Sequence, residues 1–195
     1  KILSKKELVK TFVELLSEKS FSEKEEKKFK ERGDELLSEY YDQYASKWTH
    51  KVDLEKYIKR DFRIESGETI TISGMIDKIE YLENLFGGKI NIVDYKTGRS
   101  FSEKSKDEKK DYERQIVFYH LLLEGYDENT TINQSVLDFI EKNKKGKFEQ
   151  HSFPVMQENL DELKKEINQC AREVLSLEFL SKGCGKRDCE WCAFG

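Results

Sequence analysis

The sequence contains no apolar run long enough to cross a bilayer as a helix, which takes roughly 20 residues. Its longest apolar run, from Ile116 to Leu123, is interrupted by His120. The start of the chain shows no signal-peptide pattern. There is one proline, Pro154, no internal repeat and no stretch with the composition of a linker. We therefore expect residues 1–195 to form a single cytoplasmic domain without membrane contact.

Cysteine is sparse and unevenly placed. Three of the four cysteines, Cys184, Cys189 and Cys192, lie within the last twelve residues. Scattered cysteines would suggest the disulfides of a secreted protein, whereas thiols gathered in the tail 183–195 favour a metal or cluster site in a reducing compartment. Three thiolates at this spacing suit zinc or an iron–sulfur cluster. The alternative is a tail that simply packs through its aromatic residues.

The chain also lacks a strong excess of positive charge. Charged residues make up 38% of it, and the formal net charge is −4. The total does not indicate nucleic-acid binding, but binding depends on a local basic groove rather than on the total. We expect the Lys-rich segment 99–111 to be a mobile loop whose charge suits contact with a polyanion.

Apolar periodicity predicts an α/β fold. Helical spacing indicates two helices within 1–46, a buried helix at 112–125 and a last amphipathic helix within 156–182. A connection is predicted at 47–60 and a hairpin turn at 84–88. Alternating side chains and turn residues then place the sheet core within 61–153, with strands at 61–65, 69–81, 89–96, 131–140 and 147–153.

The most informative stretch is the apolar strand that ends in Asp94-Tyr95-Lys96. Side chains alternate across a strand, so Asp94 and Lys96 leave it on the same face. A carboxylate and an ammonium at the end of a buried strand cost free energy unless they have partners. One interpretation is a structural ion pair in an unrelated α/β protein. The other is a site for a metal ion or a phosphate.

Two further motifs favour the metal site. Asp77 lies on the preceding strand, so antiparallel pairing brings it into the same sheet as Asp94. Two carboxylates can hold Mg²⁺ or Mn²⁺, which lowers the pKa of a bound water, and Lys96 can orient that water. Gln115 and Tyr119 lie one helical turn apart and can position a nucleotide. Together these residues predict phosphodiester hydrolysis.

In order and spacing, these motifs resemble the RecB-type branch of the PD-(D/E)XK nucleases. The resemblance rests on Gly74-Met75-Ile76-Asp77, on Asp94-Tyr95-Lys96-Thr97-Gly98 and on Gln115 with Tyr119. It implies a restriction-endonuclease-like core, in which a mixed central sheet is flanked by helices and preceded by a helical segment. It also implies Asp77 and Asp94 as metal ligands, Lys96 as a catalytic residue, and Gln115 and Tyr119 as DNA contacts. We add Arg99 as a phosphate contact.

The resemblance further implies a metal-dependent deoxyribonuclease, and an exonuclease in particular. Such domains occur at the C-terminal end of UvrD/Rep-like helicase–nucleases such as RecB and AddA, and in AddB-like proteins. The expected partners are therefore DNA and a helicase, as a linked domain or a separate subunit, in recombination and repair. Some relatives hold a 4Fe–4S cluster through one upstream cysteine and three near the C-terminus. Cys184, Cys189 and Cys192 suit the latter group, whereas Cys170 has a different spacing.

Two features depart from the family pattern. The family has a further metal ligand, a His on an N-terminal helix, whereas the first His of this chain is His50, which lies too near the strands for that role. Either that ligand lies upstream of Lys1, which we expect, or this protein lacks it, and the activity of residues 1–195 alone depends on it. Lys78 and Glu80 replace the family's Arg and Asp and keep their charges. The alternative function is an inactive nuclease-fold module that binds DNA or a partner protein.

Overall fold

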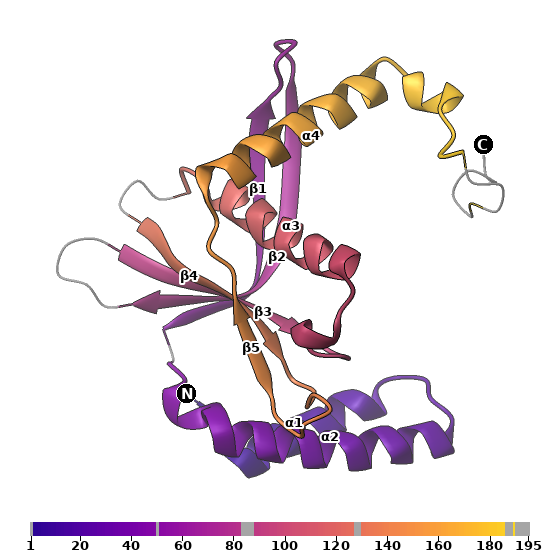
Figure 1. The fold of residues 1–195 in the computed structure, drawn as a ribbon. Coiled ribbons are helices and arrows are strands. Elements are labelled where there is room, and N and C mark those ends of the chain that lie inside the picture. Colours follow the sequence, from indigo (N-terminus) through magenta and orange to yellow (C-terminus); the bar gives the residue numbers. More distant parts are fainter. Residues whose placement is uncertain (1, 50, 83–87, 127–129, 186–188, 190–195) are drawn as a thin grey trace. The chain divides into compact units, whose positions relative to one another are not determined.

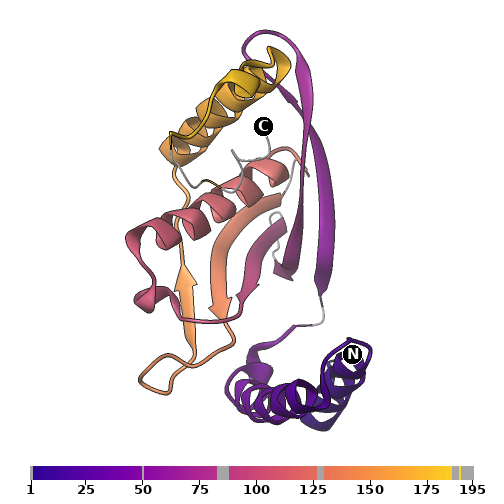
Figure 2. The same cartoon turned by 90° about the vertical axis from the view of Figure 1, so that its right-hand side faces the viewer.

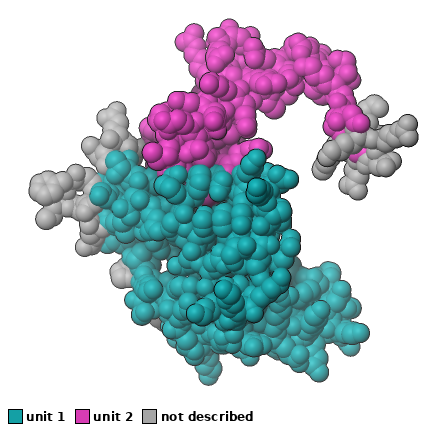
Figure 3. Space-filling view, in the orientation of Figure 1, with its two compact units in different colours: residues 1–56, 76–113, 128–154 teal, residues 57–75, 114–127, 155–195 magenta. Residues whose placement is uncertain are grey.

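The computed structural model describes residues 2–49, 51–82, 88–126, 130–185 and 189 (Figure 1). Contacts divide the chain into two compact units (Figure 3). The first comprises residues 1–56, 76–113 and 128–154, and the second comprises residues 57–75, 114–127 and 155–195. The predicted hairpin turn lies outside the described residues except for Gly88. No helix among the described residues has the length and apolarity needed to cross a membrane.

The chain begins with two helices, α1 (Lys5–Ser17) and α2 (Glu23–Tyr44). Each starts at a capping box, in which a serine and a glutamate three residues later satisfy each other's backbone N–H groups. In α2, the backbone N–H of Ser22 donates to Glu25 Oε2 at 3.0 Å. The two helices lie side by side in both ribbon views (Figures 1 and 2). A Cβ at Gly33 of α2 would lie 2.1 Å from the Phe12 ring of α1, so only glycine allows this approach.

Five strands form one sheet in the order β1-β2-β3-β4-β5. β2 and β3 pair antiparallel, β3 and β4 parallel, and β4 and β5 antiparallel. The sheet is therefore mixed, which confirms the predicted fold class. The strands are β1 (Val52–Arg63), β2 (Thr69–Leu82), β3 (Gly88–Lys96), β4 (Thr130–Phe139) and β5 (Glu149–Ser152).

Helix α3 (Lys106–Leu123) makes the crossover that the parallel pair β3–β4 requires. In the first unit, the Tyr112 ring meets the Phe139 ring of β4 edge to face, with centroids 6.0 Å apart. In the second unit, a Cβ at Gly74 of β2 would lie 2.8 Å from Leu122 Cδ1. This helix therefore approaches β2 closely at Gly74. The chain continues through α4 (Gln157–Leu175) to the short 3₁₀ segment η3 (Glu178–Ser181).

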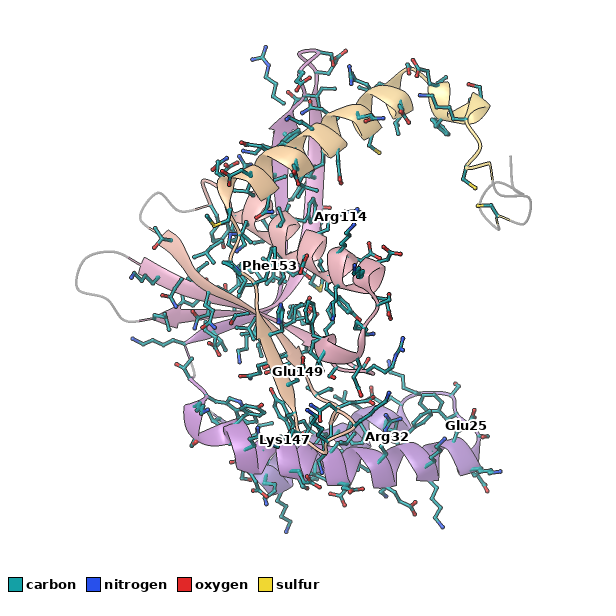
Figure 4. The ribbon with its side chains drawn as sticks, viewed as in Figure 1. Glu25, Arg32, Arg114, Lys147, Glu149 and Phe153 are labelled. Atoms are coloured by element: carbon teal, nitrogen blue, oxygen red, sulfur yellow. The ribbon has the colours of Figure 1, made fainter. Side chains whose placement is uncertain are left out.

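Side chains tie α2 to the segment that joins β4 and β5. Arg32 Nη2 lies 2.5 Å from Glu141 Oε2, and Lys142 pairs with Glu39. Figure 4 labels Arg32 on α2 and Glu149 on β5. After α2 the chain passes through η1 (Ala45–Lys47) into β1. These contacts all lie within the first unit and place the end of α2 beside β4 and β5.

Two predicted boundaries are wrong. The sequence predicted a connection over 47–60, whereas β1 starts at Val52. Glu55 has a φ of 48°, and this irregular residue interrupts the alternation that would have revealed a strand. The segment 99–111 is not one loop, because it contains η2 (Phe101–Glu103) and the first turns of α3. The Ser105 hydroxyl accepts from the Glu108 N–H at 3.2 Å, and the Ser105 N–H donates to Glu108 Oε2 at 2.9 Å.

Candidate active site

The register of β2 and β3 brings the two predicted carboxylates together. Lys78 faces Val93 in the antiparallel pairing, so Asp77 lies one residue beyond, beside Asp94. Successive side chains point to opposite faces, which puts Asp77 and Asp94 on one face and Lys78 on the other. The sequence prediction that neighbouring strands present both carboxylates on one face therefore agrees with the register.

Asp94 and Lys96 form a close ion pair. Lys96 Nζ lies 2.6 Å from Asp94 Oδ2, and the two side chains are 16% and 2% exposed. A carboxylate this deeply buried needs a nearby positive charge, because burial disfavours its ionised form. The ammonium of Lys96 supplies that charge here, and a bound cation would supply it equally well.

Asp77 has a second role in holding β2 against β3. Its Oδ2 accepts a hydrogen bond from the backbone N–H of Tyr95 at 2.8 Å. The bond crosses from β2 to β3 just past the last backbone pairing of the two strands. It fixes the Asp77 carboxylate next to the residue that follows Asp94.

Tyr112 joins this group, although it belongs to no motif that the sequence shows. Lys96 Nζ lies 5.1 Å from the centre of the Tyr112 ring, and Lys104 Nζ lies 5.2 Å from the same centre. The Lys104 side chain is only 10% exposed, and its hydrogen bond with Tyr112 raises its pKa. Cation–π attraction thus brings two ammonium groups to one ring. One of them, Lys96, pairs with Asp94, and the other, Lys104, lies 3.4 Å from Glu108 Oε1. An aromatic ring in the polar second turn of a helix carries no motif that could have identified it.

The predicted DNA contacts fall into two places. Arg99, in the first unit, is exposed and pairs with Glu108, whose carboxylate lies 3.1 Å from Arg99 Nη2. Bonds from Ser105 hold the pKa of Glu108 at about 2, so the pair is fully charged at neutral pH. Gln115 and Tyr119, in the second unit, are bonded to each other, with Gln115 Nε2 donating to the Tyr119 hydroxyl at 2.8 Å. Their role beside the carboxylates stays a prediction.

The donor set fits a hard divalent cation only in part. Asp77 and Asp94 offer carboxylate oxygens, which are the ligands that Mg²⁺ and Mn²⁺ prefer. Within the described ranges, no group of three or more His, Cys, Asp or Glu side chains is placed to hold a metal ion. The remaining ligands would therefore be water and substrate oxygens or a further side chain.

The cysteine site predicted for the tail also stays a prediction. Cys170 and Cys184 are exposed and Cys189 is half-buried. Cys192 and the predicted packing residues of the tail lie outside the described residues.

Comparisons with known proteins bear on the family and the fold of this chain. The family model described as the PD-(D/E)XK nuclease superfamily matches residues 2–195. Among solved structures, a protein from Eubacterium rectale described as a candidate exonuclease is similar, with a TM-score of 0.51 and 15% identity over 99% of this chain and 75% of that one. A second, SSO0001, has a TM-score of 0.43 and 13% identity over 87% of this chain and 84% of that one. No protein with a curated description matches.

Proposed function

Because this chain belongs to the PD-(D/E)XK nuclease superfamily, we propose that it is a divalent-metal-dependent deoxyribonuclease domain that hydrolyses phosphodiester bonds. The observation that carries the proposal is the grouping of Asp77, Asp94 and Lys96 on one face of two paired strands. An ion pair of Asp94 with Lys96 needs no second carboxylate on that face, and the hydrogen bond from the Tyr95 N–H uses only one oxygen of Asp77. The described resemblance to a candidate exonuclease supports the exonuclease mode.

In this proposal Asp77 and Asp94 hold Mg²⁺ or Mn²⁺. The cation, when bound, lowers the pKa of water and offsets the negative charge that develops on the phosphate. Lys96 orients the attacking water and donates a hydrogen bond to the developing charge. Tyr112 keeps the Lys96 ammonium in place, and Lys104 adds a second positive charge for the phosphate backbone.

The DNA itself is held outside the hydrolytic centre. Arg99 contacts a phosphate, and Gln115 with Tyr119 contacts a nucleotide of the DNA. We further propose that the domain is RecB-like and acts in the cytoplasm, in recombination or repair, together with a helicase that is covalently linked or a partner subunit. The tail cysteines would hold a 4Fe–4S cluster or zinc.

Degradation of linear DNA tests the proposal. End-labelled single- and double-stranded DNA is incubated with the longest natural chain that contains these residues, in Mg²⁺ or Mn²⁺. We expect degradation that Asp94→Asn abolishes, while Asp161→Asn, at an exposed aspartate of α4, leaves it unchanged. If neither metal supports any degradation and DNA still binds, the chain is the inactive DNA-binding module instead.

A further inference from the structure

A polar pocket lies on the sheet face opposite Asp77 and Asp94. It encloses about 370 Å³, within the range of small-molecule sites. All four strands β2 to β5 contribute to its floor, and the end of α2 with η1 forms its wall. Its lining residues belong to the first unit, and none of them is one of the proposed nuclease residues. The floor residues used below are Lys78, Glu80, Gln134, Asp138 and Gln150.

One charged pair in the floor is already satisfied. Lys78 Nζ lies 2.8 Å from Glu80 Oε1, and the two side chains are 10% and 17% exposed. The same ammonium donates to the Tyr95 hydroxyl at 3.1 Å. Glu80 Oε2 accepts from the Asn91 side chain at 3.2 Å. These residues are therefore a fixed, neutral part of the floor.

Asp138 is not satisfied in this way. Asp138 is only 3% exposed. Its Oδ2 accepts hydrogen bonds from the Tyr40 hydroxyl and from Gln150 Nε2, the latter at 2.8 Å. Its Oδ1 is buried and accepts no hydrogen bond from any described residue. Asp138 also forms no ion pair within the described part of the chain. A buried carboxylate oxygen left in this state costs free energy. Because Asp138 is one of the residues that line the pocket, an N–H or O–H donor bound there could satisfy it.

The neighbouring carboxamides present acceptors too. Gln150 Nε2 is used on Asp138, and Gln134 Nε2 donates to the Ser152 hydroxyl. Each of these side chains also carries a carbonyl oxygen, which is a further acceptor. The aromatic wall comes from Tyr44 and Trp48. A flat ligand with an amino-bearing polar edge matches both the acceptors and the wall.

We infer that this pocket binds a nucleobase that carries an exocyclic amino group, cytosine or adenine, with that amino group donating to Asp138 Oδ1. Carboxylates accept from the cytosine amino group in established base recognition. Two lysines and two acids line the pocket, so its charge is balanced and suits a neutral base better than an organic cation. Lys47, which lies 5.8 Å from the Tyr44 ring, supplies a positive charge for the phosphate of the same nucleotide.

The inference does not depend on the nuclease activity. Asp138 aligns with Tyr95 in the parallel pairing of β3 and β4, and Tyr95 points away from Asp94 and Lys96. The base would therefore occupy a site separate from the hydrolytic centre. It would come either from a free nucleotide or from an unpaired base of a nucleic-acid strand.

Calorimetric titration with matched nucleotides tests the inference, in EDTA so that no cleavage occurs. In the pairs dCMP with dUMP and dAMP with dIMP, an oxo group replaces the amino group and the adjacent ring nitrogen gains a hydrogen. We expect the wild-type protein to bind the amino member at least about tenfold more tightly, the effect of one hydrogen bond to a charged acceptor. Equal affinities within each pair would overturn the inference, as would the absence of any binding.

Asp138→Asn gives the sharper result. The amide oxygen can keep the bonds from Tyr40 and Gln150, which leaves the NH₂ group at the position of Oδ1. A donor then replaces the acceptor, so the preference should reverse toward dUMP and dIMP. An unchanged preference would overturn the inference. If Asp138→Asn does not fold, the wild-type preference and Trp48→Leu decide, the latter weakening both members of a pair about equally.

Asp94→Asn is the matched control at a buried aspartate on the opposite face, and it should keep the wild-type preference. A loss of preference in this control would overturn the inference, because the pocket would then not be a separate site.

Two arms of the titration identify the source of the base. Short oligo-dC and oligo-dU are compared with the mononucleotides. A preference shown by the mononucleotides assigns the pocket to free nucleotides, whereas one shown by the oligonucleotides alone assigns it to a base within a strand.

Discussion

The Asp94–Lys96 pair gives a measurable signature that separates a metal site from a structural ion pair. Removing one partner of a buried pair costs about 3–5 kcal/mol, because the other charge stays buried. Lys96→Met should cost about 3 kcal/mol, since the Asp94 side chain is 2% exposed. Asp94→Asn should cost about 2 kcal/mol, because the Tyr112 ring, 5.1 Å from Lys96 Nζ, retains about 1 kcal/mol of attraction.

The double variant Asp94→Asn/Lys96→Met removes both charges together. Replacing a whole buried pair is often nearly neutral, so we expect a loss of about 1–2 kcal/mol rather than the sum of about 5 kcal/mol. Urea denaturation of the four proteins gives the free energies of unfolding. Losses that add to within about 0.5 kcal/mol would refute the coupling of the two side chains.

Manganese then distinguishes the two interpretations. At about 100 times its Kd, a cation that binds only the folded protein stabilises it by about 2.7 kcal/mol. For a chain of this length the melting temperature rises by about 5–10 °C. We expect that rise in the wild-type protein and a larger one in Lys96→Met, where the cation also replaces the lost positive charge. A rise of equal size in Asp94→Asn would refute the assignment of the metal to this carboxylate.

Two further predictions concern Tyr112 and His120. Tyr112→Leu removes the ring shared by Lys96 and Lys104 and should lower kcat for cleavage about tenfold with little change in KM. Tyr112→Phe should stay near wild type, and equal losses of kcat in both variants would point to the hydroxyl instead. Burial lowers the pKa of His120 to about 4. The unfolded chain therefore takes up a proton below about pH 6.5 that the folded protein refuses, and the free energy of unfolding should fall by about 1–2 kcal/mol between pH 7.5 and pH 5. His120→Gln should flatten that part of the urea-denaturation profile, and an unchanged profile would contradict the assignment.

The core of the candidate site could be predicted because strand periodicity carries it directly. Asp77 and Asp94 are on neighbouring apolar strands, and alternation decides which face each side chain takes. The two carboxylates then share a face only if the strands pair without a shift of one residue. The pairing of Lys78 with Val93 meets this condition. Local pattern and chain order were enough.

The parts that could not be predicted depend on contacts across the fold. Nothing in a polar segment indicates that Tyr112 contacts two lysines, because that contact depends on where α3 starts relative to β3. The family motif indicated only that Lys78 keeps the positive charge of the family's arginine. In the structure Lys78 pairs with Glu80, and both lie on the face opposite Asp77 and Asp94. Asp138 belongs to no motif. That its Oδ1 accepts no hydrogen bond from the described residues can be recognised only once the positions of Tyr40 and Gln150 are known.

One missed boundary was readable from the sequence. Ser105 and Glu108 form the Ser-x-x-Glu pattern that marks a helix start. The following turns lack an apolar stripe, and that lack favoured a loop over the helix start that the Ser-x-x-Glu pattern indicates. Glu55 is different, because no sequence rule places a left-handed residue at a glutamate inside a strand.

The bond from the Tyr95 N–H to Asp77 has a consequence for how such a protein would change over generations. Asp77 serves both the reaction and the closure of two strands, whereas Lys96 contributes to folding only while it offsets the charge of Asp94. If a lineage of this domain lost its catalytic role, selection on folding would still act on Asp77. Asp94 and Lys96 should then be replaced together, and an inactive descendant should keep Asp77 but lack that pair.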